Sequence, residues 1–237
     1  MSETAVAENK PKLQLVDIDS FLSSAPAVGD AFEIDSTYDA FERIPPAKDA
    51  IYVATVTLAK DEDRRLKTGI VGSGDNKGKP YWILGFDVTL NGFNDANVPD
   101  TELAGRLRTF REDSTSFLKL TDTGRFANGL TTILTCAGIP LPSPLTEQAV
   151  VQEFIKAARN GFKVLAETKW FGSVQTGKQL KSKAGTPYDE YKVVFRGMDA
   201  FPKDPDGRPI PTAEYVDNRG RHEVFAQARI VRYYPIN

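Results

Sequence analysis

Basic and aromatic side chains interleave along four segments of this 237-residue chain, and no other pattern in the sequence has as much chemical content. Cations that follow the phosphates and aromatic rings that stack on bases are what hold single-stranded nucleic acid. We therefore predict a nucleic-acid-binding surface. Its candidate residues are Lys60, Arg64, Arg65, Lys67, Lys77, Lys79, Tyr81, Arg106, Arg108, Phe110, Arg111, Lys163, Lys169, Phe171, Lys178, Lys181, Lys183, Tyr188, Lys192 and Arg196.

Two acid–lysine pairs offer the main alternative chemistry. Glu167 precedes Lys169 by two residues, and Glu190 precedes Lys192 by two, which is the spacing of a restriction-type nuclease core. Such a core also needs a metal-binding Asp shortly upstream, and Asp100 lies far away in sequence. Alternating charges on a strand are more often a solvated surface, so a metal-dependent nuclease is an alternative rather than our main hypothesis.

Cysteine and histidine are too few for several other site types. Cys136 and His222 are the sole residues of their kinds, which excludes a disulfide framework and any zinc site built from Cys and His. We expect a non-enzymatic protein with no cofactor, in a reducing compartment. No run approaches the roughly 20 apolar residues of a membrane-spanning helix, so we expect no membrane partner and a cytoplasmic location.

Charge is distributed unevenly behind a net charge of −2. Residues 1–49 contain ten acidic and four basic side chains, whereas residues 156–237 contain nine acidic and fifteen basic ones. We interpret residues 1–49 as an acidic, loosely packed arm, with the alternative that the arm packs on the barrel through Leu13, Leu15, Ile18, Phe21 and Leu22. Such an arm would compete with DNA for the basic loops or recruit protein partners.

The candidate residues must be positioned by strands and loops. Alternating or β-branched segments predict strands at 50–59, 81–90, 106–111, 162–171 and 190–196, and a trailing strand at 223–233. Helical spacing predicts helices at 126–137 and 147–160, the second capped by Thr146 and ended by Gly161. Residues 60–80 and 172–189 read as long basic loops.

Parity along these strands divides core from surface. In the second strand the predicted core side chains are Trp82, Leu84, Phe86, Val88 and Leu90. In the fourth and fifth strands we expect Lys163, Lys169, Lys192 and Arg196 on the face opposite Val164, Trp170, Val193 and Phe195.

This element order predicts a mainly β protein with inserted helices. It matches the OB fold, a five-stranded Greek-key barrel, here with helices between strands three and four and with loops 60–80 and 172–189 beside the nucleic-acid face. We assign residues 1–49 to the arm, 50–200 to the OB-like core and 201–237 to a C-terminal extension. A β-sandwich would not explain a helical pair in the middle of the chain.

Short motifs over residues 45–200 resemble the phage-encoded single-stranded DNA-binding proteins. They are Ile44-Pro45-Pro46 before Ile51-Tyr52-Val53-Ala54, Gly78-Lys79-Pro80-Tyr81-Trp82 leading to Asn91-Gly92, Cys136-Ala137-Gly138-Ile139, and Gly161-Phe162-Lys163-Val164. The resemblance implies sequence-independent binding of single-stranded DNA during phage replication or recombination, in the infected host cell.

One departure from that resemblance concerns the end of the chain. Bacterial proteins of this function commonly end in an acidic recruiting tail, whereas this sequence ends Tyr233-Tyr234-Pro235-Ile236-Asn237. Replication or recombination proteins would therefore have to be recruited by the acidic arm. The oligomeric state stays open, a homo-oligomer included. A phage virion or scaffold protein that binds other proteins is the first alternative function, and the metal-dependent nuclease comes after it.

Overall fold

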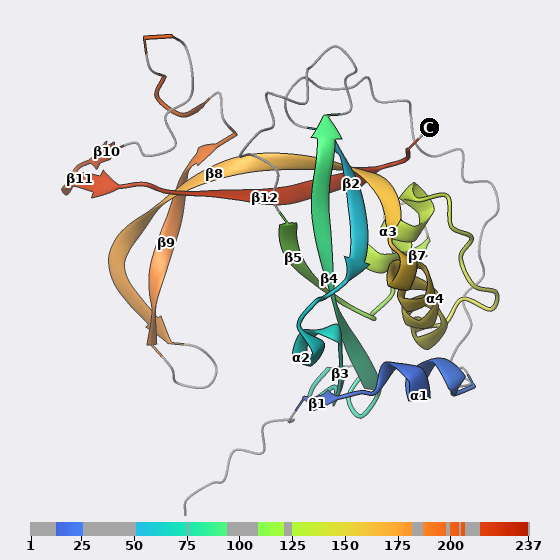
Figure 1. Cartoon of the computed structure of the whole chain (residues 1–237). Helices are drawn as coiled ribbons and strands as arrows, with labels where there is room; N and C mark the ends of the chain where they lie inside the picture. The colour runs from blue at the N-terminus through green and yellow to red at the C-terminus, as the bar shows by residue number, and fades with distance from the viewer. Residues whose placement is uncertain are drawn as a thin grey trace, which may run out of the picture. The chain divides into compact units, whose positions relative to one another are not determined.

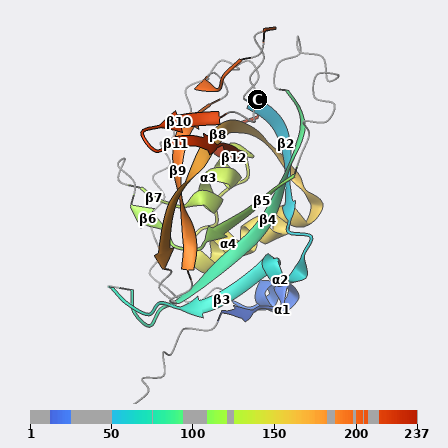
Figure 2. The ribbon, with the colours of Figure 1, turned by 90° about the vertical axis from the view of Figure 1, so that its left-hand side faces the viewer.

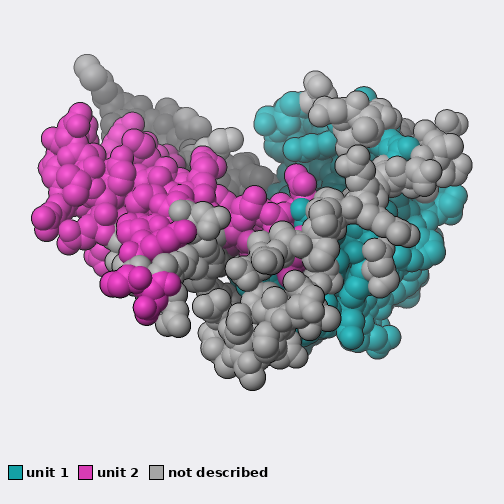
Figure 3. Space-filling view, turned by 90° about the horizontal axis from the view of Figure 1, so that it is seen from above, with its two compact units in different colours: residues 1–46, 52–165, 233–237 teal, residues 47–51, 166–232 magenta. Residues whose placement is uncertain are grey.

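The computed structural model describes residues 13–25, 51–74, 76–93, 109–120, 125–181, 187–197, 200–203, 205–206 and 214–236. The chain divides into two compact units, coloured separately in Figure 3. Unit 1 comprises residues 1–46, 52–165 and 233–237, and unit 2 comprises residues 47–51 and 166–232.

The fold is mainly β and its strand pairs are antiparallel where the register is resolved, as the sequence predicted in outline (Figure 1). The largest sheet has the order β1-β3-β4-β2-β8-β12, with β5 added on β4 and β9 added on β8. Among the described residues these strands do not close into a barrel.

Unit 1 is organised around one long strand. β4 (Pro80–Phe93) pairs with β2 (Ile51–Leu58), β3 (Leu66–Ile70) and β5 (Thr109–Thr115). The predicted core face of β4 is confirmed for Leu84, Phe86, Val88 and Leu90, each at most 4% exposed. Trp82 is half-buried.

Two helices cover this core face (Figures 1 and 2). They are α3 (Gly129–Cys136) and α4 (Glu147–Asn160), and Phe154 of α4 packs on Phe86 with ring centroids 5.2 Å apart. The predicted ends of α4 are confirmed. The Thr146 side chain accepts a hydrogen bond from the backbone N–H of Ala149, and Gly161 ends the helix at φ +73°. The short strands β6 (Lys119–Leu120) and β7 (Phe126–Ala127) precede α3.

The prediction of one long loop over residues 60–80 is wrong. A short helix, α2 (Glu62–Arg65), and β3 occupy its first half. Leu66 is fully buried, but the remainder of β3 is Lys-Thr-Gly-Ile, which is too short and too polar to produce a recognisable period. Only the turn that joins β3 to β4 fits the predicted loop.

Part of the acidic arm is folded onto unit 1. β1 (Gln14–Leu15) pairs with β3, and α1 (Ile18–Ser23) buries Phe21 against Trp82, with ring centroids 5.6 Å apart. The buried Gln152 side chain of α4 donates to the backbone carbonyls of Phe21 and Ser24 at 2.7 and 3.1 Å. Loose packing is therefore the wrong description of residues 13–25, and the rest of the arm lies outside the described residues.

Unit 2 is built on β8 (Phe162–Lys181), β9 (Pro187–Arg196), the hairpin of β10 (Glu214–Asp217) and β11 (Gly220–Glu223), and β12 (Phe225–Tyr234). β8 and β12 also contribute residues to unit 1, so the division cuts through strands rather than at residue 200. The predicted loop 172–189 is wrong over most of its length, because β8 continues to Lys181 and β9 begins at Pro187.

The core of unit 2 is small. Val174, Phe201 and Val224 are buried, and Val194, Phe195 and Tyr215 pack against them. Gly172 permits a close approach here, since a Cβ at this position would lie 2.8 Å from Val224 and 2.9 Å from Phe195. None of the described helices is long and apolar enough to span a membrane.

Candidate nucleic-acid interface

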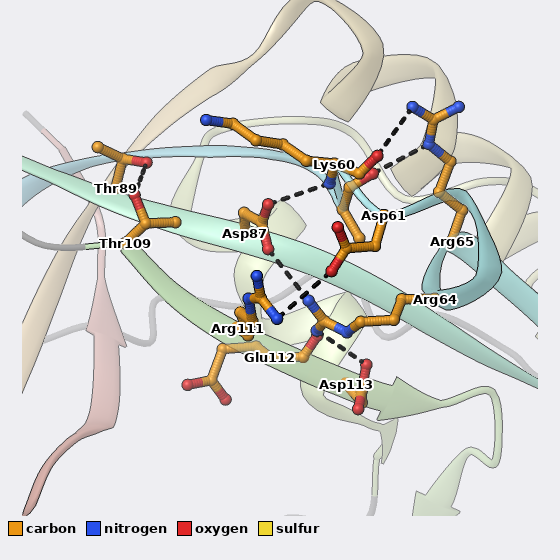
Figure 4. Close-up of polar contacts among 11 residues, drawn as sticks. Lys60, Asp61, Arg64, Arg65, Asp87, Thr89, Thr109, Arg111, Glu112 and Asp113 are labelled. Carbon is orange, nitrogen blue, oxygen red and sulfur yellow. Dashed lines mark hydrogen bonds and ion pairs between the residues drawn. The ribbon is translucent and has the colours of Figure 1, made fainter.

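Arg64 does not point to solvent as a basic loop residue would (Figure 4). Its guanidinium lies 3.4 Å from Asp87 Oδ1 and 3.3 Å from Asp113 Oδ1, and its side chain is 18% exposed. Asp87 is buried and also accepts the backbone N–H of Lys60 at 3.1 Å. Arg64 thus neutralises the carboxylate of Asp87. The alternation of the sequence along β4 predicted that Asp87 faces solvent, but the structure buries it.

The neighbouring arginines are engaged in the same way (Figure 4). Arg65 donates to the Ala59 carbonyl, and Arg111 pairs with Asp61 at 3.4 Å. Arg65 also pairs with Glu62 at 3.3 Å. Glu112 lies beside them, and its pKa is raised by burial and then by the charge of Asp113. Carboxylates outnumber arginines in this network, so it has no surplus positive charge to offer a phosphate.

The remaining candidates of unit 1 have mixed surroundings. Lys60, Lys77, Lys79 and Lys163 are exposed, and Lys67 is half-buried on β3. Tyr81 stacks on Phe117, with ring centroids 5.3 Å apart and planes 25° from parallel, and its ring covers Gly69 at 2.9 Å from where a Cβ would be. Tyr81 therefore already stacks on another ring of the same unit.

Phe110 is a correction to the predicted surface. It is 9% exposed and belongs to the core, because it pairs with Val88 of β4 and shares the buried side of the sheet. Its ring is not presented for stacking. Arg106, Arg108 and Lys183 lie outside the described residues.

In unit 2 the register of β8 and β9 sorts the side chains onto two faces. Phe171 lies opposite Arg196, and Gln175 lies opposite Tyr191. The alternate pairs, Gly172 with Phe195 and Val174 with Lys192, are on the other face, where Val174 enters the core. Directly opposed residues share a face of the sheet, so Phe171, Tyr191 and Arg196 share the one that faces away from this core.

β12 extends this outward face. The rings of Phe225 and Tyr191 meet edge to face at a centroid distance of 5.8 Å, and the Arg229 guanidinium lies over the Phe171 ring at 5.7 Å. Phe225 thus lies near the Gln175–Tyr191 pair, and Arg229 lies near Phe171. The spacing from Phe225 to Arg229 on β12 equals that from Phe171 to Gln175 on β8, as expected for two strands that lie side by side (Figure 1).

We name Phe171, Tyr191, Arg196, Phe225 and Arg229 the sheet platform. Tyr191 is 53% exposed and Phe225 is 47% exposed, which is unusual for large rings on a folded sheet. Arg196 and Arg229 are also exposed. The platform thus combines accessible aromatic faces with guanidinium groups on one surface of unit 2.

Sequence reasoning selected only Phe171 and Arg196 among these five residues. Tyr191, Phe225 and Arg229 were missed, although the alternation of residues 190–196 and the predicted trailing strand contained a usable signal. The prediction that Lys192 shares a face with Arg196 is wrong. Phe195 and Val193 oppose consecutive residues of β8, so Val194 is an extra residue, and this bulge reverses the parity between Lys192 and Arg196.

Other predicted cations of unit 2 lie near the platform or at the β8–β9 tip. Lys169 lies two residues before Phe171 on β8 and pairs with Glu167 at 3.2 Å. Lys178 pairs with Glu190 at 3.8 Å. Lys181 is exposed, as is Tyr188, which is 51% exposed opposite Leu180. The side chain of Trp170 lies outside the described part of the chain.

The acid–lysine pairs of the nuclease alternative differ in their geometry. Glu167 does contact Lys169, but Glu190 pairs with Lys178 and accepts from the Thr176 hydroxyl at 2.9 Å, rather than pairing with Lys192. Over the residues that the structure describes, no three His, Cys, Asp or Glu side chains gather in a way that could hold a metal ion.

Comparison with known proteins identified no relative of this chain. No protein-family model matches the chain, and no curated protein and no solved structure matches it either.

Proposed function

We propose that this protein binds single-stranded DNA without sequence preference, through the sheet platform of unit 2. The observation that carries the proposal is the juxtaposition of the exposed rings of Tyr191 and Phe225 with the guanidinium groups of Arg196 and Arg229. Every base has a flat face, so stacking on such rings is tolerant of sequence and contributes about 1–3 kcal/mol per base.

Single strands fit this surface better than duplexes do. In a duplex both faces of a base are covered by its neighbours in the stack, so rings that stand on a sheet can reach only unpaired bases. Arg196 and Arg229 would bind phosphates or stack on bases, because a guanidinium is planar as well as charged. These interactions need no reading of base edges, and we propose coating of single strands rather than catalysis.

The role in phage replication or recombination is also part of this proposal, and it rests on the motifs of residues 45–200 that resemble phage single-stranded DNA-binding proteins. An OB-like relationship of unit 1 is supported by β4 pairing with β2 and β5 and by the helices α3 and α4 between β5 and β8.

The test is a fluorescence anisotropy titration of labelled oligo-dT of about 20 nucleotides, at about 50 mM and about 200 mM salt. We expect binding that weakens with salt. The Tyr191→Ala and Phe225→Ala variants should each bind about 5- to 150-fold more weakly, the equivalent of one lost stacked base.

Tyr188→Ala is the matched control. Tyr188 is the same residue type on the same strand with nearly the same exposure, but alternation along β9 puts it on the face opposite to Tyr191. Its replacement should leave affinity within about twofold, if stacking occurs on the platform alone. Equal losses in all three variants would refute the platform. If oligo-dT does not bind at either salt concentration, a virion or scaffold protein is favoured. Magnesium-dependent cleavage of the oligo-dT would favour the nuclease.

A further inference from the structure

The opposite side of the β8–β9 ribbon contains an open groove of about 560 Å³, which is within the size range of small-ligand sites. Its walls come from β8, β9 and the β10–β11 hairpin, all within unit 2. Its lining includes Val174, Lys192, Tyr215, Asp217, Arg219 and His222.

The carboxylates of this groove already have partners. Asp217 lies 2.8 Å from Nε2 of His222 and accepts the backbone N–H of Arg219 at 2.7 Å. Those contacts hold its pKa below the usual range, the Arg219 backbone N–H contributing most, so the carboxylate is ionised and its charge is engaged. Glu190, the second carboxylate, is engaged by Lys178 and Thr176.

The cations of the groove are less compensated than its acids. Lys192 is exposed beside Val174 and forms no ion pair among the described residues. Arg219 lies at the turn of the β10–β11 hairpin, with an exposed side chain. An anion that enters the groove would therefore meet two positively charged groups without displacing an existing partner of Lys192.

The groove also offers a flat apolar surface. Tyr215 is half-buried, and Phe195 supports its ring edge to face at a centroid distance of 6.2 Å. Val174 lies in the same lining. An aromatic ring next to two cations is the combination that recognises a base together with its phosphate.

We propose that this groove holds one unpaired nucleotide of the bound strand, with its base against Tyr215 and its phosphate between Lys192 and Arg219. The inference rests on the proposed function, since the nucleotide belongs to the strand that the platform binds. A strand that passes around the edge of β9 would contact both faces of the ribbon.

The variants Lys192→Ala and Arg219→Ala test the phosphate contacts by anisotropy with oligo-dT. Each phosphate contact to a single strand contributes about −0.7 to the slope of the logarithm of the binding constant against the logarithm of the salt concentration. Loss of one contact should therefore lower the affinity of each variant about eightfold at 50 mM salt and about threefold at 200 mM. Lys203→Ala, which removes an exposed lysine of unit 2 outside this lining, is the control and should lose less than about twofold.

A second measurement reports on the groove directly. His222 is the only histidine of the chain, and it lines the groove. The two C–H protons of its imidazole ring therefore give the only histidine ring signals in the proton NMR spectrum, and they report on the groove. We expect oligo-dT to shift these signals in the wild-type protein and to shift them less in the Lys192→Ala variant.

The outcomes separate this inference from the proposed function. Oligo-dT that binds by anisotropy but leaves the His222 signals unmoved would overturn the groove and leave the platform intact. Absence of binding by anisotropy would overturn the proposed function and the groove with it. If thymidine 5′-monophosphate moves the His222 signals and oligo-dT does not, the groove is a site for free nucleotides and the proposal is refuted.

Discussion

Replacing Arg64 with Ala should destabilise unit 1 by about 2–4 kcal/mol without weakening DNA binding. Breaking a buried ion pair costs about 3–5 kcal/mol, because a charge is left without a partner in the interior. The Asp87 side chain is 6% exposed and would be that charge. Two features reduce the cost: Arg64 itself is 18% exposed, and the Lys60 N–H still bonds to Asp87. The second bridge adds little, since Asp113 is 59% exposed.

The assay is urea unfolding followed by circular dichroism, with Arg111→Ala as the matched control. Arg111 also pairs with an aspartate, but the two side chains are 69% and 46% exposed, so its loss should cost less than about 1 kcal/mol. The double variant Arg64→Ala/Asp87→Asn removes the orphaned charge and should recover part of the loss.

Two results would contradict this reasoning. Equal destabilisation by the Arg64 and Arg111 variants would mean that burial does not distinguish the two pairs. A folded Arg64→Ala protein that binds oligo-dT as weakly as Tyr191→Ala is expected to would mean that the arginines of unit 1 contact DNA after all, and that the sheet platform is not the main interface.

Two further predictions concern a titrating group and the folded part of the arm. The pKa of Glu112 is raised above 4.5 by burial, so its contribution to stability is fully present below that pH and is lost as pH rises through the folded-state pKa. Glu112→Gln should therefore melt at a higher temperature than wild type near pH 7 and at a similar temperature near pH 4, and a difference that is equal at both pH values would contradict this assignment. Phe21→Ala should cost up to about 3–5 kcal/mol of docking free energy and release residues 13–25, seen as faster proteolysis there and a red-shifted Trp82 emission. Unchanged proteolysis would show that Phe21 does not anchor the segment.

The elements that sequence predicted correctly are those with strong local signals. β4 alternates over its whole buried length, and α4 has both an N-cap at Thr146 and a terminating Gly161. These signals depend on residues a few positions apart, so they are readable without knowledge of the fold. The mainly β class followed from the number of such segments.

The elements that it missed depend on partners distant in sequence. The second half of β8 has only Val174 and Leu180 as large apolar residues, and its pairing with β9 rather than its own composition makes it a strand. Arg64 lies 23 residues from Asp87 and 49 from Asp113, so no local pattern could assign it to a structural network.

Sequence could not show which of the candidate residues lie on one face of a sheet. Cations and rings on the last strands were expected, whereas the bulge at Val194 determined which of them share a face. Phe225 joined the site because β12 lies beside β8, and strand order in a sheet cannot be read from sequence order.

The docking of α1 on α4 has a consequence for synthesis of the chain. The Gln152 side chain that binds the Phe21 carbonyl is 131 residues later in the sequence. At about 5–20 residues per second, a ribosome needs roughly 7–26 s to make that intervening chain. A six-residue helix is too short to persist alone in water, so residues 18–23 depend on tertiary contacts, and those with Gln152 form only after α4 has been made. The docking of α1 is therefore completed only after α4 has formed, and any delay in forming α4 prolongs the exposure of residues 18–23 to proteases.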